Sequence, residues 1–272
     1  GDKQKSVGMA AKASTATNNS GATITLSGVN STGMFGLAVG LTKSTLTNSG
    51  TINGNGEGAV GIAVNDSKAT NNSVATINLT AKKSTGMFGE VGSTVTNAGT
   101  IENTGRTTFA GKYISLENSR IKTDTNSTLH VAGDVKLNDV AIEVAAKDQN
   151  GQDKYVTAKG ITNDVITSDG TVEGTVKGEN ERDLVNVDVQ RNGNKVVANL
   201  SRKNVETYVK DSENSDEMQQ NTAQNIESAF QKLDEEIENG KAGNLSTFEK
   251  KAATLQALDL TNRAAILDSL SG

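Results

Sequence analysis

The hexapeptide Ser-Thr-Gly-Met-Phe-Gly occurs twice in this chain, at residues 31–36 and 84–89, and its surroundings repeat with it. Residues 18–36 align without gaps to residues 71–89, an offset of 53 positions. Repetition at a fixed period is the signature of folds built by stacking equivalent units, and it constrains the fold more than any local propensity. The repeat therefore predicts a structure in which one unit packs on copies of itself.

A shorter period of about 25 residues lies inside the longer one. Thr-Asn pairs at 17–18, 47–48, 70–71 and 96–97 each precede an Ile, and the spacing from Asn to Ile alternates between 6 and 4. A hydrophobe followed by Gly recurs in step with them. From these positions we expect stacked structural columns formed by Phe35, Val60 and Phe88 (with Val7), by Ile24, Ile52, Ile77 and Ile101, and by Asn48, Asn71 and Asn97. In this alignment Glu90 takes a position that is apolar elsewhere, which indicates a change of register there, because a buried unpaired carboxylate is costly.

Within each copy the apolar residues alternate, as at Phe35, Leu37 and Val39 or at Val60, Ile62 and Val64. A period of two is typical of a strand with one buried face. Short strands separated by Gly, Asn and Ser predict an all-β fold, a right-handed parallel β-helix (β-solenoid) with coils of about 25 residues. Equivalent strands would then pair about 4.8 Å apart, and stacked Asn side chains could form hydrogen-bonded ladders.

The composition alone would also fit a disordered chain, since 34% of residues are apolar, 3% are aromatic, and Pro, Cys and Trp are absent. Four copies in register argue against disorder, because stacking supplies the burial that each unit lacks. No stretch is basic enough to indicate nucleic-acid binding.

The regular register fades after residue 107, and we divide the chain into coils (residues 1–144), a capping β module (145–203) and a helical segment (204–272). Asn-Gly turns at residues 150–153 and 191–194 predict hairpins in the module, which would cover the open end of the solenoid. The last segment carries a net charge of −7 and changes to a helical period.

In that segment Ile226, Phe230, Leu233 and Ile237 are spaced 4, 3 and 4, which predicts an amphipathic helix ending near Gly240. Ser246 and Glu249 have the spacing of a capping box that opens a second helix. Its apolar face would include Phe248, Ala252, Leu255, Leu258, Ala265 and Ile266. The two helices would form an α-helical hairpin.

Catalytic motifs give little support to an enzyme. His130, the one histidine, lies in an expected strand and has no second His for a metal site. No P-loop, Gly-x-Ser-x-Gly elbow or His-Glu-x-x-His motif occurs. Some parallel β-helices are polysaccharide lyases or hydrolases, for which the best carboxylates here are Asp164, Asp169, Glu173 and Asp183. We name no catalytic, metal-binding or cofactor-binding residue.

The order of these features resembles the C-terminal passenger region of a type Va autotransporter, of the large fusobacterial adhesin kind. The residues that carry the resemblance are the two Ser-Thr-Gly-Met-Phe-Gly copies, the stretches 47–52, 96–101 and 131–144, and the ending at 262–272.

The resemblance implies an extracellular passenger on the surface of a Gram-negative bacterium, with residues 145–203 as an autochaperone that nucleates the coils. Residues 204–272 would lead to an outer-membrane translocator barrel, and the full passenger would bind protein or glycan receptors on host cells or other bacteria. It implies a stalk and folding seed. We expect no cofactor and no nucleic-acid partner. The alternative is a carbohydrate-active β-helix enzyme.

Overall fold

The computed structural model describes residues 5–103, 107–109, 112–115, 119–179, 184–212, 215–240 and 247–258. The chain divides into two compact units, each described here by itself. The first unit comprises residues 1–144, 163–179 and 189–198, and the second comprises residues 145–162, 180–188 and 199–272.

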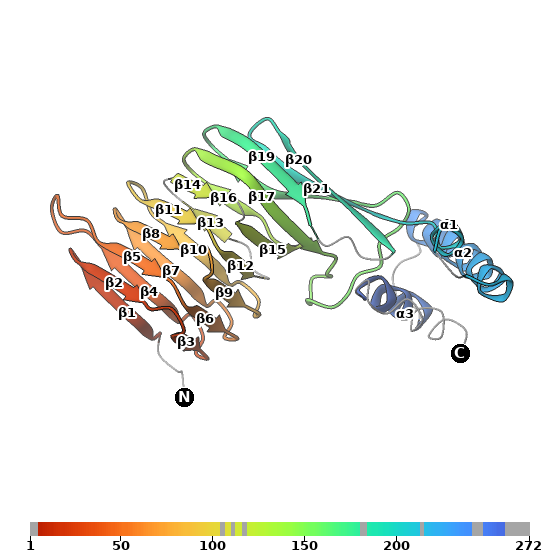
Figure 1. The fold of residues 1–272 in the computed structure, drawn as a ribbon, viewed down its shortest axis with the longest axis horizontal. Coiled ribbons are helices and arrows are strands. Elements are labelled where there is room, and N and C mark those ends of the chain that lie inside the picture. Colours follow the sequence, from red (N-terminus) through yellow and green to blue (C-terminus); the bar gives the residue numbers. More distant parts are fainter. Residues whose placement is uncertain are drawn as a thin grey trace. The chain divides into compact units, whose positions relative to one another are not determined.

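One face of the first unit is a four-stranded parallel sheet in the order β1-β4-β7-β10. Its strands are β1 (Val7–Lys12), β4 (Thr32–Leu37), β7 (Val60–Asn65) and β10 (Thr85–Gly89). They follow one another in a row in Figure 1, each beside the equivalent strand of the next coil. Equivalent residues pair across these strands because the sequence repeats with the same period as the coils.

Two further rows of parallel strands complete each coil. The first row contains β2 (Thr15–Asn18), β5 (Thr45–Asn48), β8 (Lys68–Asn71), β11 (Thr94–Asn97) and β14 (Lys112–Ser115). The second contains β3 (Thr23–Leu26), β6 (Thr51–Gly54), β9 (Thr76–Leu79), β12 (Thr100–Asn103) and β15 (Arg120–Asp124). The long strand β17 (Val135–Ala145) lies between β14 and β15, so the two rows form one 12-stranded sheet, and β19 (Val172–Gly178) pairs with β17. The predicted parallel β-solenoid is confirmed, with about five turns of about 25 residues.

A third sheet has the order β13-β16-β18-β21-β20. Its strands are β13 (Thr107–Phe109), β16 (Leu129–Val131), β18 (Ile161–Ser168), β20 (Val185–Asn192) and β21 (Lys195–Arg202). Two residues, Gly193 and Asn194, join β20 to the neighbouring β21, and Gly193 has a φ of 61°. This is the hairpin predicted from the Asn-Gly pair at residues 191–194. The other Asn-Gly pair forms a tight loop in which Asp148 N donates to Gln152 O, closed by a bridge between Lys147 and Asp153.

The helices are α1 (Val205–Lys210), α2 (Glu217–Glu238) and α3 (Thr247–Gln256). Asp216 and Gln219 form a capping box at the start of α2, and the chain turns at Gly240 with a φ of 73° after its end. The expected helix around Phe230 is thus confirmed, and the short α1 is an addition to the expected pair. Ser246, Ala265 and Ile266 lie outside the described residues.

The three helices share one buried core with other segments of the second unit. Phe230 is fully buried, with the Tyr155 ring edge-on at 5.7 Å and the Phe248 ring at 6.0 Å between centroids. Leu184 belongs to the same core. The apolar faces of the helices are therefore covered by residues of the expected capping module, a packing partner that periodicity could not identify. In the described residues, no helix combines the length and the apolarity needed to cross a membrane.

Candidate functional site

A ladder of buried asparagines runs along the first unit at the ends of β2, β5, β8 and β11. Asn18 Nδ2 donates to Asn48 Oδ1 at 2.8 Å, Asn48 Nδ2 to Asn71 Oδ1 at 2.9 Å, and Asn71 Nδ2 to Asn97 Oδ1 at 3.0 Å. An amide side chain both donates and accepts, so one residue type repeated once per coil forms an unbroken chain. Each amide is satisfied by the copy of itself one coil away.

The same asparagines also bind the backbone where the chain turns. Asn71 Nδ2 lies 3.2 Å from Thr100 O, and Gly99 N donates to Asn97 Oδ1 at 3.2 Å. A Cβ on Gly99 would lie 2.4 Å from Ala75 O, which explains why Gly follows this turn. The ladder thus fixes the turn within each coil as well as the stacking between coils.

The expected isoleucine column is present beside the ladder. Ile24, Ile52, Ile77 and Ile101 are successive strand partners, and Ile121 extends the row. Ile52 and Ile77 are fully buried. Burying an aliphatic side chain of this size contributes about 1.5–3 kcal/mol, so a column of them is a large part of the stability of the coils.

The expected column of Phe35, Val60 and Phe88 is wrong for Val60, although Phe35 and Phe88 do share a column, because each pairs with Ala63. Val60 pairs with Thr32 and Thr85, whereas Phe35 pairs with Ala63, and both Phe side chains are half-buried. In this register the first glycine of each Ser-Thr-Gly-Met-Phe-Gly copy aligns with Gly8 and Gly61. The glycine column is therefore Gly8, Gly33, Gly61 and Gly86. The large buried residues of the repeat are accordingly Met34 and Met87.

The isoleucine column is the physical reason for this register. A Cβ on Gly33 would lie 3.0 Å from Ile52 Cγ2 and 2.6 Å from Gly61 O, and a Cβ on Gly8 would lie 2.8 Å from Ile24 Cγ2. A glycine is therefore required opposite each Ile of the column. With this register Glu90 follows Gly89, which pairs with Val64, and its side chain is exposed. No change of register is needed to accommodate it.

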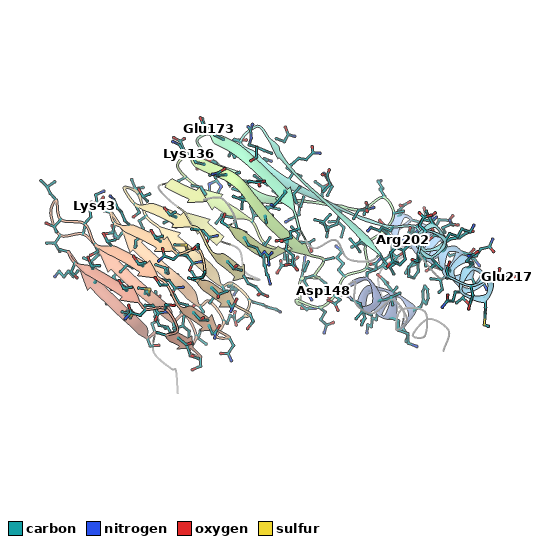
Figure 2. The ribbon with its side chains drawn as sticks, in the orientation of Figure 1. Lys43, Lys136, Asp148, Glu173, Arg202 and Glu217 are labelled. Atoms are coloured by element: carbon teal, nitrogen blue, oxygen red, sulfur yellow. The ribbon has the colours of Figure 1, made fainter. Side chains whose placement is uncertain are left out.

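The carboxylates considered for an enzyme do not form a shared site among the residues described. Asp164 pairs with Lys195 at 3.2 Å, Asp169 pairs with His130 at 3.1 Å, and Glu173 is exposed, at the outer end of β19 in Figure 2. Asp183 lies outside the described residues. Across the described part of the chain, no three His, Cys, Asp or Glu side chains are arranged to hold a metal ion.

His130 has two hydrogen-bond partners on the third sheet. Its Nδ1 lies 2.7 Å from Thr167 Oγ1 and its Nε2 lies 3.1 Å from Asp169 Oδ2. Thr167 is the residue opposite His130 on the neighbouring strand. The imidazole thus bridges two polar side chains on a partly exposed strand surface, a position compatible with the ordinary strand role expected for it.

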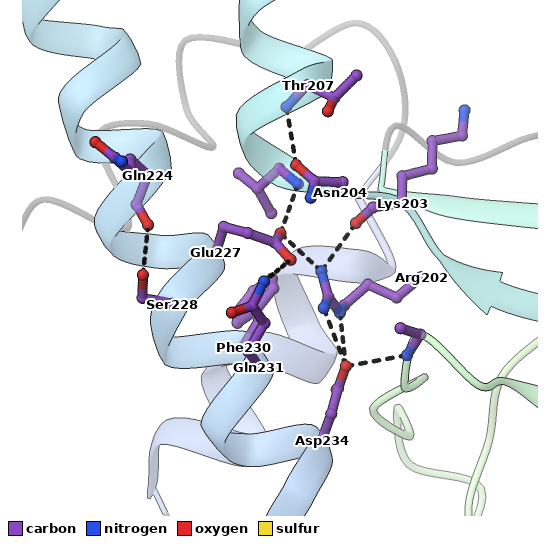
Figure 3. Close-up of polar contacts among 12 residues, drawn as sticks. Arg202, Lys203, Asn204, Thr207, Gln224, Glu227, Ser228, Phe230, Gln231 and Asp234 are labelled. Carbon is purple, nitrogen blue, oxygen red and sulfur yellow. Dashed lines mark hydrogen bonds and ion pairs between the residues drawn. The ribbon is translucent and has the colours of Figure 1, made fainter.

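The most concentrated electrostatics lie in the second unit, around Arg202 (Figure 3). Arg202 Nη1 donates to Glu227 Oε2 at 2.8 Å, and Nη2 and Nε donate to Asp234 Oδ2 at 3.0 and 3.2 Å. The side chains of all three residues are less than one-tenth exposed. The guanidinium also lies 5.5 Å from the centroid of the Phe230 ring. One cation therefore holds two buried carboxylates of α2.

The same carboxylates bind the backbone and a buried phenol. Tyr155 Oη donates to Asp234 Oδ1 at 2.6 Å, Ala158 N to Asp234 Oδ2 at 3.1 Å, and Val205 N to Glu227 Oε2 at 2.8 Å. Burial raises the pKa of the Tyr155 hydroxyl well above its usual value, and the hydrogen bond to Asp234 raises it further. Burial opposes the charge of Arg202, but hydrogen bonds to Glu227 and Asp234 raise its pKa above the ordinary value. Tyr155 therefore stays neutral and Arg202 stays charged.

Helix α3 is attached to the same segment by one amide. Val156 N donates to Gln256 Oε1 at 2.8 Å, and Gln256 Nε2 donates to Val156 O at 2.9 Å. The Gln256 side chain thus satisfies the backbone N–H and C=O of buried Val156, as a neighbouring strand would. Residues 155–158 are held by α2 through Asp234 and by α3 through Gln256.

Beside the Arg202 network is a cavity of about 380 Å³. It is lined by Ala158, Arg202, Asn204, Glu227, Gln231, Asp234 and Glu235. Its lining carries three carboxylates and one guanidinium, so an anion would be repelled there.

Sequence reasoning missed this network, although one signal points to it. Glu227 and Asp234 lie three residues before and four after Phe230, which places two carboxylates on the apolar face of α2. Charged residues on a buried face require a partner. The partner, Arg202, lies 25 residues before Glu227 at the end of β21. No periodicity in the sequence relates a residue on that strand to the helix.

Comparison with protein families gives a match to the first unit. The sequence model of a family described as BigA third pectate lyase-like domain matches residues 2–110, which lie in the first unit. This match supports a β-helix related to those of passengers of autotransporter-type adhesins, displayed on a bacterial surface. No curated protein matches. No solved structure matches.

Proposed function

We propose that this chain is the C-terminal part of a type Va autotransporter passenger, in which it is both stalk and folding seed for an adhesin. The observation that carries the proposal is the combination of unbroken side-chain ladders with a family match over the same coils. BigA is an adhesin of the autotransporter type. A rod of self-similar coils suits a protein that holds a binding region away from the cell.

The ladders also support sequential folding. Each buried Asn needs the neighbouring coil for its hydrogen bonds, so a coil gains stability only when it is added to one already formed. A module that folds without a coil template would be the starting point. Residues 145–203 fit that role, because they supply Tyr155, Leu184 and Arg202 to a core and ion pairs that join segments of the second unit alone.

The folding-seed proposal is tested by displaying the natural full-length protein on bacteria with and without residues 145–203. We expect the deletion to leave secretion detectable but to abolish the protease-resistant solenoid at the surface. Normal resistance in the deletion strain would contradict the autochaperone role. Arg202→Met tests the same role with one substitution, and Lys210→Met, which removes an exposed i to i+4 ion pair, is its matched control.

The proposed partners are protein or glycan receptors on host cells or other bacteria, and the outer-membrane translocator of the same protein. No nucleic-acid partner and no cofactor are part of the proposal. A binding screen of the full-length passenger against epithelial monolayers and partner bacteria tests adhesion. Absence of binding to both would contradict the adhesin function while leaving the fold unaffected.

A carbohydrate-active enzyme is the second candidate, favoured by the pectate lyase-like description of the matching family. It predicts polysaccharide turnover that is lost in Asp169→Asn or Glu173→Gln. A degradation screen over acidic and neutral polysaccharides decides between the candidates, since a stalk turns over none of them.

A further inference from the structure

One corner of the solenoid carries an insertion in the second coil. The chain passes from β1 to β2 through two residues (13–14) and from β7 to β8 through two (66–67). It passes from β10 to β11 through four residues (90–93), but from β4 to β5 through seven, residues 38–44. We call residues 38–44 the corner loop. A short connection suffices to close this corner, so the extra residues are not needed for the fold.

The corner loop has a defined structure. Val39 N donates to Thr42 O at 3.0 Å and Thr42 N donates to Val39 O at 3.1 Å, which closes a two-residue turn. Gly40 adopts a φ of 59° in that turn, a conformation that favours glycine. At its base, buried Ser44 donates from Oγ to Leu37 O at 2.7 Å.

Lys43 fastens the loop to the next two coils. Its Nζ lies 2.8 Å from Asp66 Oδ1 in the third coil and donates to Gly92 O at 3.0 Å in the fourth. Figure 2 labels Lys43 among the loops at this corner. Both contacts are made by the Lys43 side chain, two residues from Leu41 at the tip of the loop. They hold the tip in place before any partner binds.

The tip presents aliphatic side chains to solvent. Leu41 is 101% exposed and Val39 is 47% exposed, and Val91, beside the anchoring residue Gly92, is 78% exposed. The charge of Lys43 is paired within the corner. A preformed loop that exposes a large aliphatic side chain can bury that side chain against a partner with little loss of conformational freedom.

We propose that the corner loop is a docking element that inserts Leu41 into an apolar pocket of a protein partner. The inference rests on the proposed adhesive function and specifies its partner as protein. Residues 38–44, 66–67 and 90–93 contain no aromatic ring on which a sugar could stack. The one lysine of the loop is neutralised by Asp66, so an anionic glycan finds no free cation on it. Aliphatic groups without such partners favour a protein pocket over a glycan.

The test measures binding of the full 272-residue chain, labelled at its N-terminus, to epithelial monolayers and to whole cells of a partner bacterium. We expect Leu41→Ser to weaken binding about 10- to 30-fold, because the burial of one leucine side chain in the interface is lost. Val74→Ser is the matched control, since Val74 is 82% exposed in the turn between β8 and β9 of the same unit, and we expect it to bind like wild type. Lys43→Met, which frees the tip, should weaken binding about two- to fivefold.

Target treatments identify the partner class. Protease treatment of the target cells should abolish binding, and periodate oxidation of their glycans should leave it unchanged. The proposal is overturned if Leu41→Ser binds like wild type, if wild type binds neither target, or if periodate rather than protease removes binding. Self-association of wild type that Leu41→Ser abolishes would assign the loop to a second copy instead.

These outcomes are separate from failure of the proposed function. Leu41 is fully exposed, so Leu41→Ser should retain the circular dichroism spectrum and protease resistance of wild type. A stalk that is displayed normally but does not bind through Leu41 would overturn this inference alone.

Discussion

Asn71 in the first unit and Arg202 in the second are both buried polar residues, but they are stabilised by different kinds of partner. Asn71 bonds Asn48 and Asn97, which are copies of itself one coil away. Arg202 bonds Glu227 and Asp234, two residues that lie outside the repeated coils. The first unit thus distributes its stability over equivalent contacts, and the second concentrates it in a few unique ones.

This difference has consequences for folding. A repeated contact can be lost in one coil while the neighbouring coils keep theirs, so damage should remain local. A unique contact on which α2, a loop and a strand all depend has no substitute. A folding seed benefits from the second arrangement, because it forms completely or not at all. The predictions below test this contrast, in order of decreasing effect.

Arg202→Met should produce the largest loss of stability. It leaves the buried carboxylates of Glu227 and Asp234 without their cation, which costs about 3–5 kcal/mol. In purified chains whose coils have already folded, hydrogen exchange followed by mass spectrometry should show α2 and α3 exchanging much faster, with peptides of β4 to β9 unchanged.

The charge-neutral triple variant Arg202→Met, Glu227→Gln, Asp234→Asn is the control for that prediction. It removes the orphaned charges while keeping oxygen acceptors for Tyr155 and the backbone. We expect it to recover most of the lost stability. A triple variant as unstable as the single one would show that packing, rather than charge, holds the helices.

Met34→Ala and Phe35→Ala test the register of the first unit. Met34 is fully buried, and truncating a buried methionine to alanine costs about 2–5 kcal/mol. Phe35 is half-buried, so its truncation should cost clearly less despite the larger side chain. Denaturant melts of the two variants compare the costs, and hydrogen exchange should confine the damage to β1, β4 and β7. A greater cost for Phe35 would contradict the glycine column at Gly33.

The register of the first unit could be predicted from the sequence only in part. The isoleucine and asparagine columns could be predicted, because each occurs once per coil and has no competing alignment. The first copy of the hexapeptide contains two glycines, each followed by a hydrophobe as Gly8 and Gly61 are, but only the second glycine is also preceded by a hydrophobe. The packing of Gly33 against Ile52 favours the first glycine, and that contact joins two faces of a coil.

The second unit could be predicted only as separate elements. The helix around Phe230, its end at Gly240 and the hairpin at Gly193 follow from local signals. The contacts that join these elements, such as Gln256 to Val156, span 100 residues and occur once. Periodicity carries no information about contacts that do not repeat.

Asn71→Ala should cost less than the core truncation, about 1–3 kcal/mol. The loss arises because Asn48 Nδ2 is left without its side-chain acceptor in a buried position. Asn78→Ala is the control, since Asn78 also bonds an asparagine, Asn53, but is only half-buried. We expect that substitution to change the unfolding free energy by less than about 1 kcal/mol. Equal effects in thermal melts would show that the ladder is no more important than an outer-face amide pair.

The smallest predicted effect concerns Glu249 in the second unit and depends on pH. Burial, together with the neighbouring Glu236, raises the pKa of Glu249 above its usual value. Because the folded pKa exceeds the unfolded one, ionised Glu249 disfavours the fold, and stability from this group is present at low pH and lost as pH rises through its folded pKa. Glu249→Gln should therefore raise the melting temperature of the second unit slightly at pH 7 and leave it unchanged near pH 4.

Glu206→Gln, at an exposed ion pair with Lys210, is the control and should show no such gain at pH 7. A gain for Glu249→Gln that is equal at both pH values would mean that the substitution acts through packing or capping. In that case repulsion between Glu249 and Glu236 would not be what lowers the stability of the second unit at neutral pH.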